Sequence, residues 1–308
     1  MSADQVLAAY GDQLFMAAIV VYTLASVLQV VEYGARKDVP ARALVGAGGA
    51  ETQISGKEPA QRSRADRFGR MAVSLLVLGA LLHLTSIVLR GLSADRWPMG
   101  NMYEYISALC LASVIAWLIV LRRAPSMRPI GIFVIPIVLL LMFLAGTALY
   151  AASAPVAPAL DSSWMIFHVT TAILSSGLLL VPGVASCLYL AKRSGRPAAI
   201  AAKLPPAHAL DRIAYRVTVA AFPLYTFALI CGGIWAEAAW GRFWGWDPKE
   251  TVAFVAWVVY AAYLHARATA GWRADRAAWI NALGFAVVMF NLFFINLVVA
   301  GLHSYAGV

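Results

Sequence analysis

Long runs of apolar residues recur along the whole chain, and short polar segments separate them. Each run holds about 20 residues, enough for an α-helix to cross a hydrocarbon core about 30 Å thick. The runs lack the alternation of apolar and polar positions that a membrane β-barrel requires. The pattern therefore predicts an all-α, polytopic integral membrane protein with about eight transmembrane helices, at Leu14–Val31, Met71–Leu89, Tyr105–Leu121, Ile130–Ala151, Trp164–Ala191, Val217–Ile234, Thr251–Ala266 and Trp279–Leu302.

The composition agrees with a protein whose surface is covered largely by lipid. Of the 308 residues, 62% are hydrophobic and 13% are charged, whereas a soluble domain would carry roughly twice that charged fraction. The first run follows Asp4 and Asp12 rather than basic residues, so we expect a transmembrane helix and not a cleaved signal peptide. Neither an internal repeat nor a C-x-x-C pair is found, which favours a single membrane domain over residues 1–308, without a dithiol or zinc site.

The basic residues predict the orientation of the chain. The net charge is +9, and twenty of the 24 Lys and Arg residues follow the first, third, fifth and seventh runs. The positive-inside rule places those segments in the cytoplasm and both termini outside. This charge therefore reports membrane topology and not a nucleic-acid partner. Residues 34–70, rich in Gly, Ala and charge, are predicted to form a mobile basic cytoplasmic loop.

The most unusual segment, residues 235–250, lies between the sixth and seventh predicted helices and reads WAEAAWGRFWGWDPKE. It is predicted to be an external Trp-rich loop that contains Trp235, Trp240, Trp244 and Trp246. An aromatic belt at the lipid–water interface is one interpretation, but four tryptophans within twelve positions are dense for such a belt. Indole faces can instead form a platform for a flat aromatic ligand.

The end of this segment predicts a sharp helix start. Asp247 is suited to be an N-cap, Pro248 fits the first helical position, and Glu250 stands where a capping box places its acid. Arg242 and Lys249 are two of four basic residues predicted on the outer side, so they are candidates to bind the carboxylates of a ligand. Charge at a membrane edge would explain both nearly as well.

The five histidines differ in predicted depth. His168, one turn into the fifth predicted helix, and His303, after the eighth, are expected at the same outer face, where two imidazoles beside the tryptophans suit a bis-His haem. His265 lies roughly 22 Å from the outer end of the seventh helix. It is either functional at that depth or directed towards the cytoplasmic interface. His83 could pair with His265, and His208 is given no role.

Several motifs resemble those of one family. The stretch GGIWAEAAWGRFWGWDPKE is similar to the tryptophan-rich WWD domain of haem-handling proteins. The chain more closely resembles the CcsA/ResC subunit, called CcsB in some bacteria, of the system II cytochrome c synthase. Its eight predicted helices and its C-terminus favour system II over the larger CcmF-like and smaller CcmC-like relatives. The likeness runs from about residue 70 to the end and includes PMGNMYE at 98–104, WMIFH at 164–168, AYLH at 262–265 and GLHSYAG at 301–307.

The resemblance implies a role in cytochrome c biogenesis, as a holocytochrome c synthase (haem lyase) subunit active with a CcsB/ResB-type membrane partner. It implies that His168 and His303 ligate the iron of haem b beside Trp235–Asp247. It also implies that His265 ligates haem within the membrane, with the second ligand supplied by the partner. No side chain acts as a nucleophile, because the thiols of a C-x-x-C-H segment in apocytochrome c attack the haem. Thiol-reducing thioredoxin-like proteins are further implied partners.

The implied location is the cell (cytoplasmic or inner) membrane, crossed several times, with the active face extracytoplasmic. Two other functions stay open at the level of sequence. A haem exporter would bind haem at the same histidines and form no thioether. A quinone-linked cytochrome b subunit would require histidine pairs at both membrane levels, and here the inner level offers His265 and at best His83.

Overall fold

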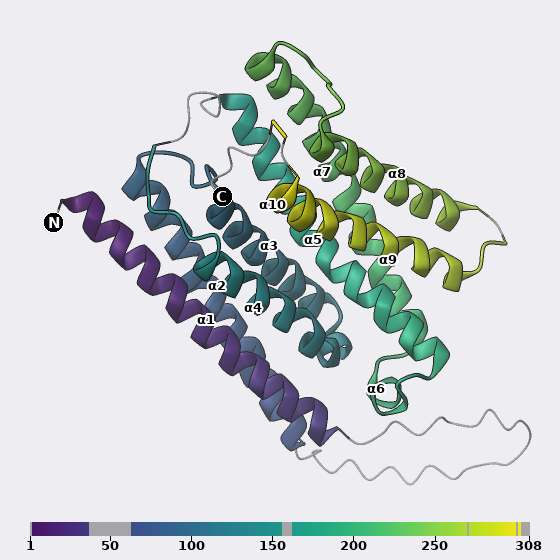
Figure 1. Ribbon diagram of the computed structural model, residues 1–308. Coiled ribbons are helices and arrows are strands. Elements are labelled where there is room, and N and C mark those ends of the chain that lie inside the picture. Colours follow the sequence, from purple (N-terminus) through teal and green to yellow (C-terminus); the bar gives the residue numbers. More distant parts are fainter. Residues whose placement is uncertain (1, 37–62, 156–161, 270, 300, 303–308) are drawn as a thin grey trace, which may run out of the picture.

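The computed structural model describes residues 2–36, 63–155, 162–269, 271–299 and 301–302. Within these ranges every regular element is a helix (Figure 1). Eight helical segments are long and apolar enough to cross a membrane. They confirm the prediction of an all-α polytopic membrane protein, and they are α1 (Ala3–Ala35), α2 (Arg64–Ala94), α3 (Met102–Arg123), η1 with α4 (Pro125–Ile130, Gly131–Thr147), α5 (Ser163–Ser194), α7 (Ala207–Trp240), α8 (Pro248–Ala268) and α9 with η3 and α10 (Ala274–Phe290, Asn291–Ile295, Asn296–Val298).

Two helix ends differ from the predicted loops. Helix α2 begins at Arg64, inside the predicted loop 34–70, because Ser63 caps it by accepting a hydrogen bond from the Asp66 amide at 3.2 Å. Residues 37–62 of that loop lie outside the described residues. Helix α7 continues to Trp240 through good helix formers and ends at Gly241, whose φ of +70° suits a helix C-terminus. Residues 235–250, predicted as one loop, are therefore the end of α7, a shorter loop at residues 241–247 and the first turn of α8.

Helix α5 is the central element of the bundle. It contacts α3 on one side and α7 and α9 on the other, and Figure 1 shows it between the α1–α4 group and the α7–α9 group. A short helix, α6 (Ala198–Lys203), joins α5 to α7. The α5–α3 contact is close, since a Cβ added at Gly177 would lie 2.7 Å from the Ala112 Cβ and 2.9 Å from the Leu109 carbonyl oxygen. Small residues allow such approach in membranes, where helices gain no hydrophobic driving force from each other.

We predict that Gly177→Leu destabilises the bundle, because the new side chain must displace α3 from α5. Overpacking of this kind costs about 1–3 kcal/mol, measurable as a lower unfolding temperature in detergent. Gly34→Leu is the control, since a Cβ at Gly34 meets no atom within 4 Å. Equal unfolding temperatures for the two variants would contradict the close α3–α5 contact.

Candidate functional site

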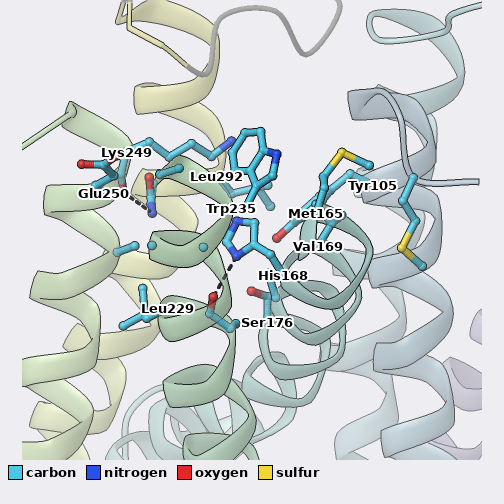
Figure 2. A pocket seen from close by; sticks show the side chains of 18 of the residues that line it. Tyr105, Met165, His168, Val169, Ser176, Leu229, Trp235, Lys249, Glu250 and Leu292 are labelled. Atoms are coloured by element: carbon cyan, nitrogen blue, oxygen red, sulfur yellow. Dashed lines mark hydrogen bonds between the residues drawn. The ribbon is translucent and has the colours of Figure 1, made fainter. Parts of the chain in front are cut away.

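A cavity lies at the end of the bundle where α7 passes into α8, and Figure 2 shows the side chains of 18 of the residues that line it. Helices α3, α5, α7, α8 and α9 all contribute to its wall. The lining is mostly apolar, with a few polar groups directed into it, as is usual for small-molecule sites. The residues used below are His168, Trp235, Trp240, Trp244, Lys249 and Glu250.

The His168 side chain is held by α7. Its ring stacks on Trp235, with centroids 6.1 Å apart and planes 9° from parallel. Its Nδ1 lies 2.8 Å from the Ala228 carbonyl oxygen, and a carbonyl can only accept, so Nδ1 carries a proton and, in the neutral ring, Nε2 is the basic nitrogen. A Cβ at Gly232 would lie 2.8 Å from both Cε1 and Nδ1 of the ring. Glycine at this position therefore makes room for the imidazole.

Three of the four tryptophans form one wall of the cavity. Trp235 is 2% exposed, and the Trp240 ring meets it edge-on, with centroids 4.8 Å apart at 64°. Trp244 also lines the cavity. Trp246 is 70% exposed, has a left-handed φ of +59° and meets Trp244 edge-on at 5.8 Å. The aromatic wall thus comes from the end of α7 and from the loop that follows it.

Lys249 brings a positive charge into this apolar cavity. Figure 2 shows its side chain extending across the cavity towards Trp235. Its ammonium group donates a hydrogen bond to the Asn296 Oδ1. Asn291 lies beside it in the cavity wall and donates a hydrogen bond to the Lys249 carbonyl at 3.3 Å. The π-helical segment η3 begins at Asn291, and such irregular turns often occur at functional sites.

Arg242 stands next to the aromatic wall. Its guanidinium carbon lies 5.9 Å from the centre of the Trp240 ring, and its Nη1 lies 3.7 Å from the Glu250 Oε2. That Nη1 is buried and has no hydrogen-bond partner among the described residues. A Cβ at Gly245 would lie 1.1 Å from it, so glycine leaves the space that the guanidinium fills. Arg242 itself is not among the residues that line the cavity, and its charge reaches the cavity wall through Glu250.

Asp247 has a structural role at two places. Its Oδ1 accepts a hydrogen bond from the Lys249 amide at 3.0 Å, while Glu250 accepts one from the Asp247 amide at 3.2 Å, which confirms the predicted capping box. Its Oδ2 accepts a hydrogen bond from the Leu302 amide at 2.8 Å. Asp247 thus ties the residue before His303 to the start of α8. Asp247 is buried outside the cavity wall, and His303 itself lies outside the described residues.

The other histidines do not meet at this cavity. His265 lies in the last turn of α8, far from His168 along the bundle, and its side chain is exposed. His83 is completely buried on α2, where its Nε2 lies 2.9 Å from the Ser107 Oγ. Because α2 packs against α1 and α3 whereas α8 packs against α7 and α9, the pairing of His83 with His265 that the sequence left open is wrong. His208 is exposed on α7.

The residue pattern alone does not predict the wall opposite α7. Met99, Gly100, Asn101, Met102 and Tyr105 line the cavity from the start of α3. Their signal was present as the weakly family-like stretch at residues 98–104, but nothing in the sequence placed that stretch beside the tryptophans. The contacts of Ala228 and Gly232 with His168 were missed for the same reason, since apolar small residues in a span give no sign of what they touch.

The fold and the site define a polytopic helical membrane protein with a histidine- and tryptophan-lined cavity at one membrane face. Comparison with known proteins agrees with this class. Residues 99–303 match the model of the cytochrome c assembly protein family. The cytochrome c biogenesis protein CcsA of Synechococcus sp. (strain RCC307) is 34% identical, with 76% of this chain and 84% of that protein covered. CcsA of Chlamydomonas reinhardtii is 33% identical, with 76% and 69% covered.

The fold has a relative of known structure. The cytochrome c haem lyase CcmF superposes with a TM-score of 0.66 over 93% of this chain, at 18% identity, and the chain spans 46% of the length of that protein. This likeness concerns the fold. The family match and the CcsA relatives show that the chain belongs to the cytochrome c assembly protein family, and that its role is in cytochrome c biogenesis.

We predict that Asp247→Ala releases the segment that ends at Leu302, because the variant loses both the N-cap and the bond to the Leu302 amide. Ser162→Ala, which removes the N-cap of α5 alone, is the control, and each lost cap costs about 1 kcal/mol. Hydrogen exchange of residues 296–302 should accelerate in Asp247→Ala and stay unchanged in Ser162→Ala. Equal exchange in both variants would refute the tether.

Proposed function

We propose that this protein binds haem b as its substrate at the outer face of the cell membrane and, with a CcsB/ResB-type partner, attaches it covalently to apocytochrome c. The observation that carries the proposal is the His168 imidazole, which stacks on Trp235 and is fixed through Nδ1 to the Ala228 carbonyl inside an aromatic cavity. A hydrogen bond at Nδ1 orients the ring so that Nε2 can ligate a metal.

The haem iron would be held by His168 and His303. The Leu302 amide, one residue before His303, is bonded to Asp247 at the start of α8, and this supports a second ligand close to the aromatic wall. Trp235, Trp240 and Trp244 would shield the porphyrin from water. Two imidazoles and a dry aromatic surrounding suit haem iron of low oxidation state.

The haem propionates would meet Arg242 and Lys249. The buried Arg242 Nη1 has no hydrogen-bond partner among the described residues, and the Lys249 ammonium reaches into the cavity (Figure 2). A guanidinium and an ammonium both form strong charge-assisted hydrogen bonds with carboxylates. The Arg242 Nη1 has an ion pair with Glu250 at 3.7 Å but no hydrogen bond within the described part of the chain. A buried donor without a hydrogen bond is costly, so a ligand carboxylate that reached it would stabilise the site.

In this reaction the chain has to position the haem vinyl groups and the apocytochrome thiols, and it need not supply a nucleophile. Each thiol of the C-x-x-C-H segment adds across one haem vinyl group, so that sulfur bonds to one vinyl carbon and hydrogen to the other, with no net oxidation or reduction. The cysteines must arrive reduced, which is the task of thioredoxin-like partners. Holding the vinyl groups and the thiols together makes the addition effectively intramolecular.

His265 would serve a second haem position within the membrane, shared with the partner subunit. Its side chain is exposed on α8, so a second imidazole can reach the same iron from a neighbouring protein. His265 lies in the last turn of α8, so this second position would lie near that end of the span. Haem would pass from this position to the outer cavity.

We predict that His168→Ala abolishes the sharp absorption bands of a bis-His haem in the purified complex with its partner. Loss of a direct ligand should weaken haem binding by more than the roughly 10–100-fold that loss of a ligand's hydrogen-bond partner costs. His208→Ala is the matched control, because His208 is exposed on the cytoplasmic part of α7 in our topology. Spectra of the oxidised and reduced forms give the readout.

The same preparations distinguish synthase from exporter. Thioether-linked haem on a co-expressed apocytochrome supports the synthase, whereas bound haem without thioether product supports export alone. Unchanged haem spectra in His168→Ala would remove the outer site from the proposal.

We also predict that Glu237→Cys is labelled by a membrane-impermeant maleimide in intact cells and that Ala202→Cys is not, in a Cys187→Ser background. Glu237 lies near the C-terminal end of α7, and Ala202 lies in α6, just before the N-terminal end of α7; both side chains are exposed. The other two cysteines, Cys110 and Cys231, are buried. Labelling in the reverse order would invert the topology and place the cavity at the cytoplasmic face.

A further inference from the structure

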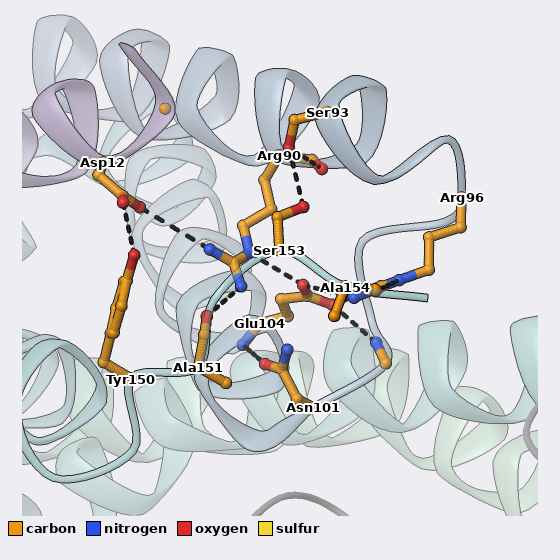
Figure 3. A network of polar contacts seen from close by, with 12 residues as sticks. Asp12, Arg90, Ser93, Arg96, Asn101, Glu104, Tyr150, Ala151, Ser153 and Ala154 are labelled. Atoms are coloured by element: carbon orange, nitrogen blue, oxygen red, sulfur yellow. Dashed lines mark hydrogen bonds and ion pairs between the residues drawn. The ribbon is translucent and has the colours of Figure 1, made fainter. Parts of the chain in front are cut away.

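Glu104 is a buried acid at the cavity end of α3. It is 3% exposed and accepts hydrogen bonds from the Arg90 Nε at 2.9 Å and from the Arg96 Nη1 and Nη2 at 2.8 and 2.9 Å. It also accepts one from the Gly100 amide at 2.8 Å. Figure 3 shows the carboxylate enclosed by these donors. Glu104 therefore joins α2, the turn after α2 and the start of α3.

The two arginines also hold the segment that follows α4. Arg90 donates to the Ala151 carbonyl and Arg96 donates to the Ala154 carbonyl at 2.7 Å (Figure 3). These bonds fix residues 148–155 against α2 and against the turn that follows it. We call Glu104 with Arg90 and Arg96 the outer ion cluster.

Helix α1 takes part through Asp12. Its carboxylate lies 3.8 Å from the Arg90 Nη1 and accepts a hydrogen bond from the Tyr150 hydroxyl at 2.6 Å. This bond raises the pKa of the Tyr150 hydroxyl above its ordinary value. The Arg90 guanidinium also lies 4.8 Å above the Tyr103 ring. Two acids and two arginines balance in charge, which lowers the cost of placing them at a membrane edge.

The outer ion cluster adjoins the cavity that His168 and the tryptophans line. Gly100, bonded to Glu104, lines the cavity together with Met99, Asn101 and Met102. Residues 99–102 and His168 line the same cavity. Arg90 and Arg96 belong to α2 and the turn after it, and both precede residue 99, where the match to the family model begins.

We propose that Glu104, Arg90 and Arg96 are positioning residues that hold the Met99–Met102 wall of the cavity, and that α1 and α2 serve the site through them. This positioning role rests on the proposed haem function where it is tested through bound haem, and it does not where it is tested through the exposure of Met99. An unpaired arginine or carboxylate left in this place would pull the 95–101 segment towards water, so the wall would move although no cavity residue had changed.

The chain offers a matched control at the other end of the bundle. Glu32 is 1% exposed and is bonded to the Arg36 Nη2 at 2.9 Å and to the Arg128 Nε at 2.7 Å. It is as buried and as paired as Glu104, yet it lies at the opposite end of α1 from the cavity and is absent from its wall. Loss of either acid should disturb the fold to a similar degree.

The experiment compares Glu104→Gln with Glu32→Gln. The first readout is the absorption maximum and reduction potential of bound haem in the complex with its partner. The second needs no haem: the maleimide labelling rate of Met99→Cys in the Cys187→Ser background. We expect Glu104→Gln to shift both haem properties and to raise the labelling rate several-fold, and Glu32→Gln to change neither.

Equal effects of the two substitutions, or no effect of either, would overturn the positioning role and leave Glu104 as an ordinary helix anchor. Should Glu104→Gln fail to fold, Arg96→Gln takes its place, because Arg90 still pairs with the acid there. If the wild-type protein binds no haem, the proposed function fails, and the labelling rate alone decides the role of the outer ion cluster.

Discussion

The packing of α5 against α7 is the contact on which the site depends. Ala228, Gly232 and Trp235 lie on one face of α7, spaced by four and three residues, and His168 of α5 touches all three. In a bilayer such contacts rest on close packing and hydrogen bonds, because lipid removes the hydrophobic gain between helices. The same contact that holds the two helices together therefore also orients the imidazole.

The bilayer also decides where charge can be buried. Glu32 and Glu104 are each bonded to two arginines, and each stands near an end of its helix. An unpaired carboxylate would be far more costly there than in water. The apolar middle of the α1–α3 bundle instead holds a histidine, His83, which meets the Ser107 hydroxyl. Ion pairs near the helix ends and a neutral hydrogen bond within the bundle are expected, because the cost of burying a charge rises with depth in the membrane.

Hydropathy predicted the eight spans because length and apolar content alone decide whether a helix can cross the membrane. The capping box at Asp247 was also predictable, since its residues are local in sequence. Hydropathy does not give the direction in which a side chain points, so it cannot decide whether His83 and His265 pair. Polar residues after the apolar run predict a loop at Trp235 and Trp240, but Ala and Glu are good helix formers and continue α7 through both.

The cavity wall shows how a site can depend on residues outside the region that a family model matches. The matched region begins at residue 99, and the acid that steadies the wall, Glu104, lies within it. That acid needs buried donors, and any helix end at the same depth can supply them. Here α2 and its turn do so, through Arg90 and Arg96. The supporting residues are set by depth and charge, so they appear only once the helices are placed in space.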